Sequence, residues 1–304
     1  MDKAGEGLLE LGRALQSASY TFVTPTPETH RRVYDRRAVA RDLRDVFGWS
    51  RPFARELLPA HWLALLEAAG ALEEHGSLLR SRVRYSTLEG GLYVHSAYPT
   101  DAVDSVFFGP DTYRFCAFLS RNAPRAERVI DIGCGSGAGG MVAALASGAR
   151  ALVLADVNLR ALRYAQVNVH LHARPPAVQF AESDVLGGVE GEFDLIVANP
   201  PYMRDPTQRA YRDGGGAHGE ALSVRIVREA LLRLAPSGTL LLYTGAAIVE
   251  GEDVFLRALR PLFEGWTFSY AELDPDVFGE ELERPGYEQV ERIAAIGLCV
   301  RRPA

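Results

Sequence analysis

The chain of 304 residues has few cysteines and no long apolar run. Its cysteines, Cys116, Cys134 and Cys299, show no paired spacing, which predicts free thiols in a reducing compartment rather than a disulfide framework. Apolar stretches such as Met141–Ala146 are far too short to cross a bilayer, and the first residues lack the apolar segment of a secretion signal. These absences predict a cytoplasmic protein without a membrane partner.

The chain also lacks a surplus of positive charge and a cluster of metal ligands. A formal net charge of −6 and a pI near 5.7 argue mildly against a protein that binds mainly nucleic-acid phosphates. Eight arginines between residues 31 and 55 still leave RNA or an acidic partner open, although interleaved aspartates favour a salt-bridged helix surface. His170 and His172 alone are too few ligands for zinc, so no metal site is predicted.

The length and the 47% hydrophobic content allow one large domain and a smaller one. We expect residues 1–104 to form a substrate-recognition or dimerisation domain and residues 105–304 to form the second domain. In the first domain, helices are predicted at residues 28–38, 38–47 and 51–71. Two short extended segments are predicted after them, at residues 78–86 and 91–96. Helices followed by a small hairpin resemble a winged-helix module, and such a domain would allow a homodimer.

From residue 126 onward, strand-like and helix-like segments alternate. Strands are predicted at residues 128–132, 150–155, 177–182, 193–198 and 239–244, and helices at residues 138–146, 159–172 and 219–234. This alternation predicts an α/β fold with a doubly wound, mostly parallel sheet. The last two extended runs, Thr267–Leu273 and Arg292–Val300, have no full crossover helix between them. We therefore expect them to form an antiparallel pair, which brings the sheet to seven strands.

A glycine-rich turn follows the first of these strands. Residues 129–137 read Val-Ile-Asp-Ile-Gly-Cys-Gly-Ser-Gly, and a helix is predicted directly after them. Gly133, Gly135 and Gly137 allow a sharp turn that a ligand can approach, and the first helix amides would face that ligand. Such a turn binds either a dinucleotide or S-adenosylmethionine. Gly135, Gly137 and Gly140 fit the dinucleotide pattern G-x-G-x-x-G, and Asp156 lies about 20 residues on, where a ribose-binding acid belongs. Asp131 favours the second ligand, because its carboxylate suits a positive amino group and repels a pyrophosphate.

A second motif, Asn199-Pro200-Pro201-Tyr202, follows the strand predicted at residues 193–198. The side-chain carbonyl of Asn199 and the backbone carbonyl of Pro200 can accept the two hydrogens of a planar nitrogen, which points its lone pair at a methyl donor. The prolines restrict the backbone, so these acceptors need little rearrangement. Tyr202 is predicted to stack on the planar group. A dinucleotide-dependent dehydrogenase has no need of this motif.

These segments resemble the successive motifs of class I S-adenosylmethionine-dependent methyltransferases. The matching segments are Val129–Gly137, Ala155–Asn158, Ser183–Val185 and Asn199–Tyr202. With Asp213–Gly216 and Ala235–Gly238, the chain more narrowly resembles the release-factor glutamine methyltransferases and related amino-group methylators. The resemblance covers about residues 105–302. It implies a Rossmann-like domain and S-adenosylmethionine as the cofactor.

The resemblance also assigns roles to individual residues. Asp156, at the end of the second strand, would accept hydrogen bonds from both ribose hydroxyls, although a solvated turn aspartate or a helix cap is the alternative for this residue. Asp184 would accept a hydrogen bond from the adenine amino group, with a strand-end turn as its alternative. The predicted cofactor-binding set is Asp131, Gly133, Gly135, Gly137, Asp156, Val157, Asn158, Ser183, Asp184, Val185 and Asn199. The predicted catalytic set is Asn199, Pro200 and Tyr202.

The expected function is therefore transfer of a methyl group to a nitrogen of a protein glutamine, an RNA base or a small metabolite. The first hundred residues do not resemble the recognition domain of the release-factor enzymes, which leaves the acceptor open. One alternative is a small-molecule N- or O-methyltransferase with a dimerising N-terminal domain. The other is a protein that binds the cofactor without turnover.

Overall fold

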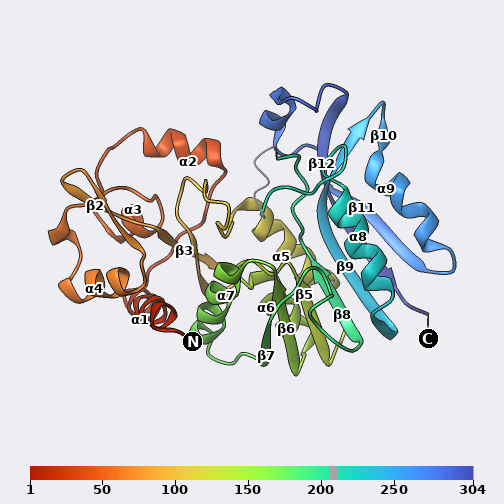
Figure 1. The fold of residues 1–304 in the computed structure, drawn as a ribbon, viewed down its shortest axis with the longest axis horizontal. Helices are drawn as coiled ribbons and strands as arrows, with labels where there is room; N and C mark the ends of the chain where they lie inside the picture. The colour runs from red at the N-terminus through yellow and green to blue at the C-terminus, as the bar shows by residue number, and fades with distance from the viewer. Residues whose placement is uncertain (206–210, 304) are drawn as a thin grey trace. The chain divides into compact units, whose positions relative to one another are not determined.

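The structure is a computed structural model that describes residues 1–205 and 211–303 (Figure 1). The described chain forms two compact units, and each draws on more than one stretch of sequence. The first unit contains residues 1–114, 135–138 and 160–175, and the second contains the remaining described residues. In the described ranges, none of the helices is both long and apolar enough to cross a bilayer.

The first unit consists of short helices and two separate β-hairpins. Its helices are α1 (Lys3–Ser17), α2 (Pro27–Tyr34), α3 (Leu43–Phe47), η1 (Arg55–Leu57), α4 (Ala60–Ala68) and most of α7 (Leu159–Leu171). The antiparallel hairpins are β1 (Leu72–His75) with β2 (Leu78–Ser81), and β3 (Val83–Leu88) with β4 (Gly91–Ser96). One apolar core joins α1 to α7, and Leu8, Leu11, Tyr164 and Val167 all contribute to it.

Several sequence predictions for this unit were wrong in detail. The helices predicted at residues 28–38 and 38–47 are shorter, because α2 ends at Tyr34 and α3 begins only at Leu43, after its cap Asp42. The helix predicted at residues 51–71 is confined to α4 and the short η1, because Pro52 and Pro59 interrupt the segment and proline cannot continue a helix interior. The extended segment predicted at residues 78–86 is divided at Arg82 between two strands. Each of these strands pairs within its own hairpin, so the unit has two hairpins where one was expected. The winged-helix resemblance stays a prediction.

The second unit is built around the α/β sheet that the sequence predicted. Its strands are β5 (Arg128–Ile132), β6 (Ala151–Asp156), β7 (Ala177–Glu182), β8 (Phe193–Ala198), β9 (Leu234–Val249), β11 (Thr267–Asp274) and β12 (Val290–Arg301). Their order is β11-β12-β9-β8-β5-β6-β7, and the two-residue β10 (Glu252–Asp253) pairs with β9 as an eighth strand. In this order, every pair of neighbouring strands between β9 and β7 is parallel. Strand β12 is antiparallel to β9 and also to β11, and the antiparallel pairing of the last two strands was expected.

Helices of the second unit cover both faces of this sheet. On one face, α8 (Ala221–Leu231) and α9 (Val254–Leu259) pack through Ile226 and Phe255 against alternate residues of the strands, such as Ile130. On the other face, Phe115 of α5 (Pro110–Asn122) contacts Tyr243 with ring centroids 6.2 Å apart, and Gly140 of α6 (Ala138–Ser147) lies against Leu154. Burial on both faces explains why the central strands β5, β6 and β8 are almost continuously apolar.

Candidate active site

The strand register brings the predicted residues to one edge of the sheet. Ile132, the last residue of β5, pairs with Ala155 of β6 and with Ala198 of β8. The next residue along each chain segment is Gly133, Asp156 or Asn199, respectively. Because neighbouring strands lie about 4.8 Å apart, Asp156 and Asn199 flank the start of the glycine turn at a separation of about 10 Å between their strands. Ligands bind at this carboxyl edge in open parallel sheets.

The glycine turn has the backbone that only glycine adopts easily. Gly133, Gly135 and Gly137 have φ values of +67°, +53° and +77°. A Cβ added at Gly133 would meet no atom within 4 Å, so this part of the turn faces open space. The Cys134 amide donates to the Ala155 carbonyl at 3.0 Å, which fixes the turn to the end of β6. The turn therefore leaves room for a ligand to approach its backbone.

Asp131 lies inside the edge rather than on its surface. The side chain is 2% exposed, and its Oδ2 accepts a hydrogen bond of 2.7 Å from the Gly140 amide in the first turn of α6. Burial raises the pKa of Asp131 to about 8, and the nearby charge of Asp156 raises it further, against the lowering effect of the Gly140 hydrogen bond. Asp131 thus holds the helix start behind the glycine turn. Its direct contact with a cofactor amino group stays a prediction.

Asp156 and its two successors form a turn at the end of β6. Asp156 Oδ1 accepts a hydrogen bond of 2.8 Å from the Asn158 amide, while Val157 between them is 53% exposed. Asp156 also raises the pKa of the Cys134 thiol, after the larger effect of burial, so these two residues lie within electrostatic reach of each other. The turn is the local role that the sequence allowed for Asp156. The ribose and adenine contacts stay predictions.

The three residues predicted beside adenine have different surroundings. The Ser183 hydroxyl donates to the Val185 carbonyl at 2.9 Å and accepts from the Gly188 amide at 2.9 Å. Val185 has a φ of +53°, which is rare for a β-branched residue, and its side chain is buried in the core of the unit. Asp184 is exposed and forms a bidentate ion pair with Arg225 of α8 at 2.9 and 3.0 Å. Their contact with adenine stays a prediction, and for Val185 it would have to involve the backbone.

The corner after β8 separates a half-buried asparagine from a buried tyrosine. Within the described part of the chain, the Asn199 side chain makes no hydrogen bond, and Pro200 behind it is buried. Tyr202 is only 7% exposed, and its ring contacts Phe278 edge-on with centroids 6.1 Å apart. Stacking of Tyr202 on an acceptor stays a prediction. In the structure its ring packs within the protein.

Glycines let other segments approach this corner closely. A Cβ at Gly245 in β9 would overlap the Tyr202 ring, and a Cβ at Gly219 would overlap the Tyr202 carbonyl. The Gly214 amide donates to the Met203 carbonyl at 2.8 Å, so the chain that begins at Asp213 runs alongside the corner. Tyr202 is thereby held from two sides.

Sequence reasoning missed several of these partners. It did not single out Gly245 as a site residue, although a glycine within an apolar strand often marks a close approach of another group. The pairing of Asp184 with Arg225 joins residues 41 positions apart and gave no local signal. The fixing of Asp131 by the Gly140 amide was hidden for a different reason, because Gly140 also fits a dinucleotide motif.

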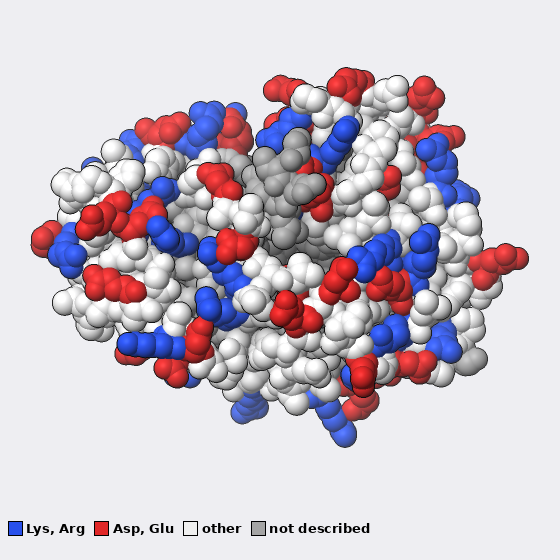
Figure 2. Space-filling model, in the orientation of Figure 1, with Lys and Arg blue, Asp and Glu red and all other residues white. Residues whose placement is uncertain are grey.

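The arginine-rich segment of the first unit supports the milder interpretation of its charges. Arg31 and Arg32 pair with Glu28, and Arg37 pairs with Asp45, so the arginine-rich segment forms ion pairs of its own. On the face drawn in Figure 2, basic and acidic side chains are interspersed. No group of three or more metal-ligating side chains comes together among the residues that the structure describes.

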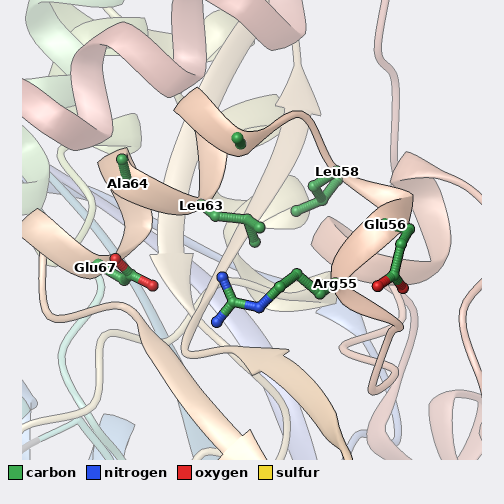
Figure 3. A pocket seen from close by; sticks show the side chains of 7 residues that line it. Arg55, Glu56, Leu58, Leu63, Ala64 and Glu67 are labelled. Atoms are coloured by element: carbon green, nitrogen blue, oxygen red, sulfur yellow. The ribbon is translucent and has the colours of Figure 1, made fainter.

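A pocket of about 360 Å³ lies in the first unit, and none of its lining residues is a predicted site residue. It is bordered by η1 and α4, and Figure 3 shows the Arg55 side chain extending below Leu63 in the direction of Glu67. Arg55 and Glu67 give its rim both charges, whereas Leu58 and Leu63 form an apolar wall. Nothing about this pocket connects it with the carboxyl edge of the sheet.

Comparison with known proteins places the described edge within a matching segment. The family model "Methyltransferase small domain" matches residues 114–252. The ribosomal RNA small subunit methyltransferase C of Chromohalobacter salexigens is 38% identical over 123 residues, which are 40% of this chain and 33% of that protein. A provisionally named protein N5-glutamine methyltransferase of Methanocaldococcus jannaschii is 30% identical over 140 residues, which are 44% of this chain and 68% of that protein.

A solved structure has the same fold at much lower identity. The M. jannaschii protein TYW2, crystallised in complex with AdoMet, has a TM-score of 0.50 and 14% identity, covering 76% of this chain and 92% of that chain. Across three of the curated relatives, this chain spans only 33% to 58% of the relative's length. The similarity therefore concerns the sheet and its edge more than the whole proteins.

Proposed function

Because the chain belongs to the class I S-adenosylmethionine-dependent methyltransferases, we propose that it is an enzyme that methylates a nitrogen of an amide or an aromatic amine. The observation that carries this proposal is the Asn199-Pro200 corner at the carboxyl end of β8, directly beside the glycine turn of β5. The free amide of Asn199 is consistent with the role, since no other described residue engages it.

The residues at this edge suit S-adenosylmethionine, the cofactor of the family. The open space at Gly133 admits a ligand close to the backbone. Asp156 makes the edge acidic, and burial is the main cause that raises the pKa of Asp131 to about 8, so a positive charge bound nearby would favour its ionised form. We infer that Asp156 binds the ribose hydroxyls, with Val157 and Asn158 beside adenine. The Asp156 carboxylate disfavours a pyrophosphate at the same place.

The residues of the chain itself then only have to bind and orient the acceptor nitrogen. When bound, S-adenosylmethionine supplies a methyl group that its sulfonium has already activated. Asn199 Oδ1 and the Pro200 carbonyl accept the two hydrogens of the acceptor nitrogen and orient its lone pair. Proline limits the motion of both acceptors, so little reorganisation is needed on binding. The nitrogen becomes acidic once it bears the methyl group, so its proton can pass to water without a general base on the chain.

A protein glutamine is the acceptor that we favour. The relative named as an N5-glutamine methyltransferase matches over 68% of its length, whereas the ribosomal RNA enzyme matches over 33% of its length. The ion-paired arginines in the first unit also weaken the case for a phosphate-binding face. An RNA base remains the second candidate, because the ribosomal RNA relative has the higher identity over the shared segment, at 38%.

Label transfer tests the proposal. The full chain is incubated with methyl-labelled S-adenosylmethionine and separate protein, RNA and small-molecule fractions of a cell extract. We expect label in the protein fraction, on a glutamine that mass spectrometry of peptides identifies. Label confined to RNA would select the second candidate, and label confined to small molecules would select a metabolite enzyme. Binding of the cofactor without transfer to any fraction would contradict the proposed activity.

A further inference from the structure

Arg84 is a buried cation without an acidic partner. It lies in β3 of the first unit and is 3% exposed. Burial is the main cause that lowers the pKa of Arg84, and the titratable groups that oppose it are three tyrosines, Tyr20, Tyr113 and Tyr98, which are neutral near pH 7. No carboxylate pairs with Arg84 among the described residues. A buried, unpaired guanidinium is unfavourable, because no anion replaces the water it has lost.

The hydrogen bonds around Arg84 do not supply the missing negative charge. Its Nη2 donates to Thr24 Oγ1 at 3.1 Å, while its buried Nε has no hydrogen-bond partner. Thr24 and Ser86 hydroxyls lie 2.6 Å apart, and Ser86 is 2.8 Å from His95 Nε2. The Arg84 guanidinium also lies over the Phe22 ring at 5.7 Å, which covers its face and leaves its edge to make hydrogen bonds.

The direction of each proton in this network follows from one carbonyl. His95 Nδ1 lies 3.1 Å from the Ser96 carbonyl, so Nδ1 carries the proton and Nε2 accepts from Ser86. Ser86 must then accept from Thr24, and Thr24 accepts from Arg84. Every hydroxyl proton in the chain is directed away from the guanidinium. The protein therefore offers Arg84 one neutral hydrogen-bond acceptor and no negative charge.

A second buried arginine in the same unit has an acidic partner, which it shares with Arg37. Arg51 is 2% exposed, and its Nε lies 3.4 Å from Asp45 Oδ1. Its other nitrogens donate to the backbone carbonyls of Val33 and Tyr34. The comparison shows that this unit can place an aspartate beside a buried arginine, and that it does not do so at Arg84.

We propose that Arg84 is the anchor of a ligand site in the first unit, and that the ligand is an organic monoanion with a carboxylate. A carboxylate can meet the unpartnered Nε edge of a guanidinium with two parallel hydrogen bonds. The Tyr113 hydroxyl accepts from the Thr24 amide at 3.1 Å and belongs to the same polar surroundings. This site lies outside the carboxyl edge of the sheet, and its existence does not depend on the proposed function.

The surrounding charges favour a monoanion over phosphate. His95 and His30 both stay neutral, because burial, reinforced by the Arg84 charge, lowers the pKa of each imidazole. The pKa of His30 falls to about 3. One positive charge therefore faces the ligand, which a carboxylate neutralises, whereas a phosphate dianion would bury an excess negative charge.

Thermal unfolding of the full chain tests the site without any turnover. The melting temperature is measured in sodium acetate and in sodium chloride at the same ionic strength. We expect acetate to raise it in a saturable manner beyond chloride, because the ligand binds the folded state. Equal melting temperatures in the two salts would overturn the proposal. A saturable rise with inorganic phosphate but not with acetate would overturn the carboxylate assignment.

Substitutions of the two buried arginines separate a ligand anchor from a structural residue. Arg84→Met should abolish the difference between acetate and chloride and should melt at or above the wild-type temperature in chloride, since it removes an uncompensated charge. Arg51→Met should melt lower, because it leaves the Val33 and Tyr34 carbonyls without their hydrogen-bond donor, and should keep the acetate effect. If Arg84→Met retains the acetate effect, the proposal is wrong. Arg84→Lys provides a second test. Lysine keeps the positive charge but cannot donate two parallel hydrogen bonds to a carboxylate, so this substitution should reduce the acetate effect.

Discussion

Asn199 differs from the acidic residues at the carboxyl edge of the sheet because its side chain is not engaged by any described residue. Asn199→Ala should therefore leave the fold and the cofactor affinity nearly unchanged. It removes one of two acceptors that orient the nitrogen, so we expect kcat to fall about 100-fold or more, which corresponds to about 3 kcal/mol. Initial rates and calorimetric titration of S-adenosylmethionine provide the two numbers. An equal loss of rate and affinity would contradict the role given to Asn199.

Asp156→Ala is the matched control at the neighbouring strand. Loss of a charge-assisted hydrogen bond costs about 1.5–3 kcal/mol, so cofactor affinity should fall about tenfold to 100-fold. With saturating cofactor, kcat should fall much less than in Asn199→Ala. Unchanged affinity would remove Asp156 from the ribose site and leave it as a turn residue.

Asp131 should make stability depend on pH in an unusual direction. Its pKa is raised in the folded state to about 8, mainly by burial, so between about pH 4 and pH 8 the folded state binds more protons than the unfolded state. Folding stability contributed by this group is therefore lost as the pH rises through that window. Asp131→Asn keeps an acceptor for the Gly140 amide but cannot ionise. Urea denaturation without cofactor should show the variant gaining about 1–3 kcal/mol on wild type between pH 5 and pH 8.5.

The same experiment has a clear contrary outcome. If the free energy of unfolding of wild type and Asp131→Asn changes in parallel across this range, the carboxyl does not titrate as its burial implies. The cofactor affinity of the variant is the second readout. It should weaken at pH 8.5, where wild type presents a carboxylate to a positively charged ligand and the variant presents an amide.

At the level of single residues, sequence reasoning located the edge but not all of its contacts. Asp156 and Asn199 directly follow apolar strands, and the carboxyl ends of parallel strands meet at one edge, so their placement was predictable. The burial of Tyr202 was not, because it depends on Gly245 and Phe278, which lie far along the chain. The exposed ion pair of Asp184 with Arg225 was hidden for the same reason.

Among whole elements, the strands of the sheet were the most predictable. The observed bounds of β5, β7 and β8 match those predicted at residues 128–132, 177–182 and 193–198. Strands β5 and β8 are buried on both faces and are followed by Gly133 and by Asn199-Pro200, so their apolar runs have sharp limits. The edge strand β7 is largely exposed and ends at Glu182. The first hundred residues form short helices and hairpins whose bounds depend on packing against α7, and local pattern does not encode that contact.

The contact between β9 and the corner after β8 can be tested by a single methyl group. In Gly245→Ala, the added Cβ would overlap the Tyr202 ring, which is held between Gly245 and Phe278. Overpacking of this kind costs about 1–3 kcal/mol, and displacement of Tyr202 should also move Asn199 and Pro200. We expect lower stability in urea denaturation together with lower kcat.

Tyr202→Ala supplies the control for this contact. In that background the ring is gone, so Gly245→Ala should cost little further stability, and the double-mutant cycle should give a coupling energy close to the cost of Gly245→Ala alone. Additive effects of the two substitutions would mean that Gly245 acts on something other than Tyr202.

Across the whole molecule, the two compact units interleave along the chain. Residues 160–175 belong to the first unit, although they follow the glycine turn and β6 in sequence. The Asn168 side chain binds both backbone groups of Val94, accepting from its amide at 2.7 Å and donating to its carbonyl at 3.0 Å. The boundary expected near residue 104 stays a prediction, and the interleaving makes it testable.

A chain that begins at residue 105 should fold poorly, because it retains α7 without the partners of α7. Tyr164, Val167 and Leu171 are buried against residues of α1 and the β3–β4 hairpin, and Asn168 would lose the Val94 groups that satisfy its buried amide. An exposed apolar face and an unsatisfied polar group each destabilise a fold. We expect this fragment to bind the dye ANS and to melt without a cooperative transition.

Polar substitutions on α7 identify the cause of this behaviour. Leu171→Gln and Tyr164→Gln together should reduce ANS binding by the fragment, because they remove the apolar surface that truncation uncovers. In the full chain the same pair should lower stability by several kcal/mol, since both side chains are buried in its first unit. A fragment from residue 105 that melts cooperatively without these substitutions would show that α7 folds independently of the first hundred residues, and that the sequence-based boundary separates two autonomous domains.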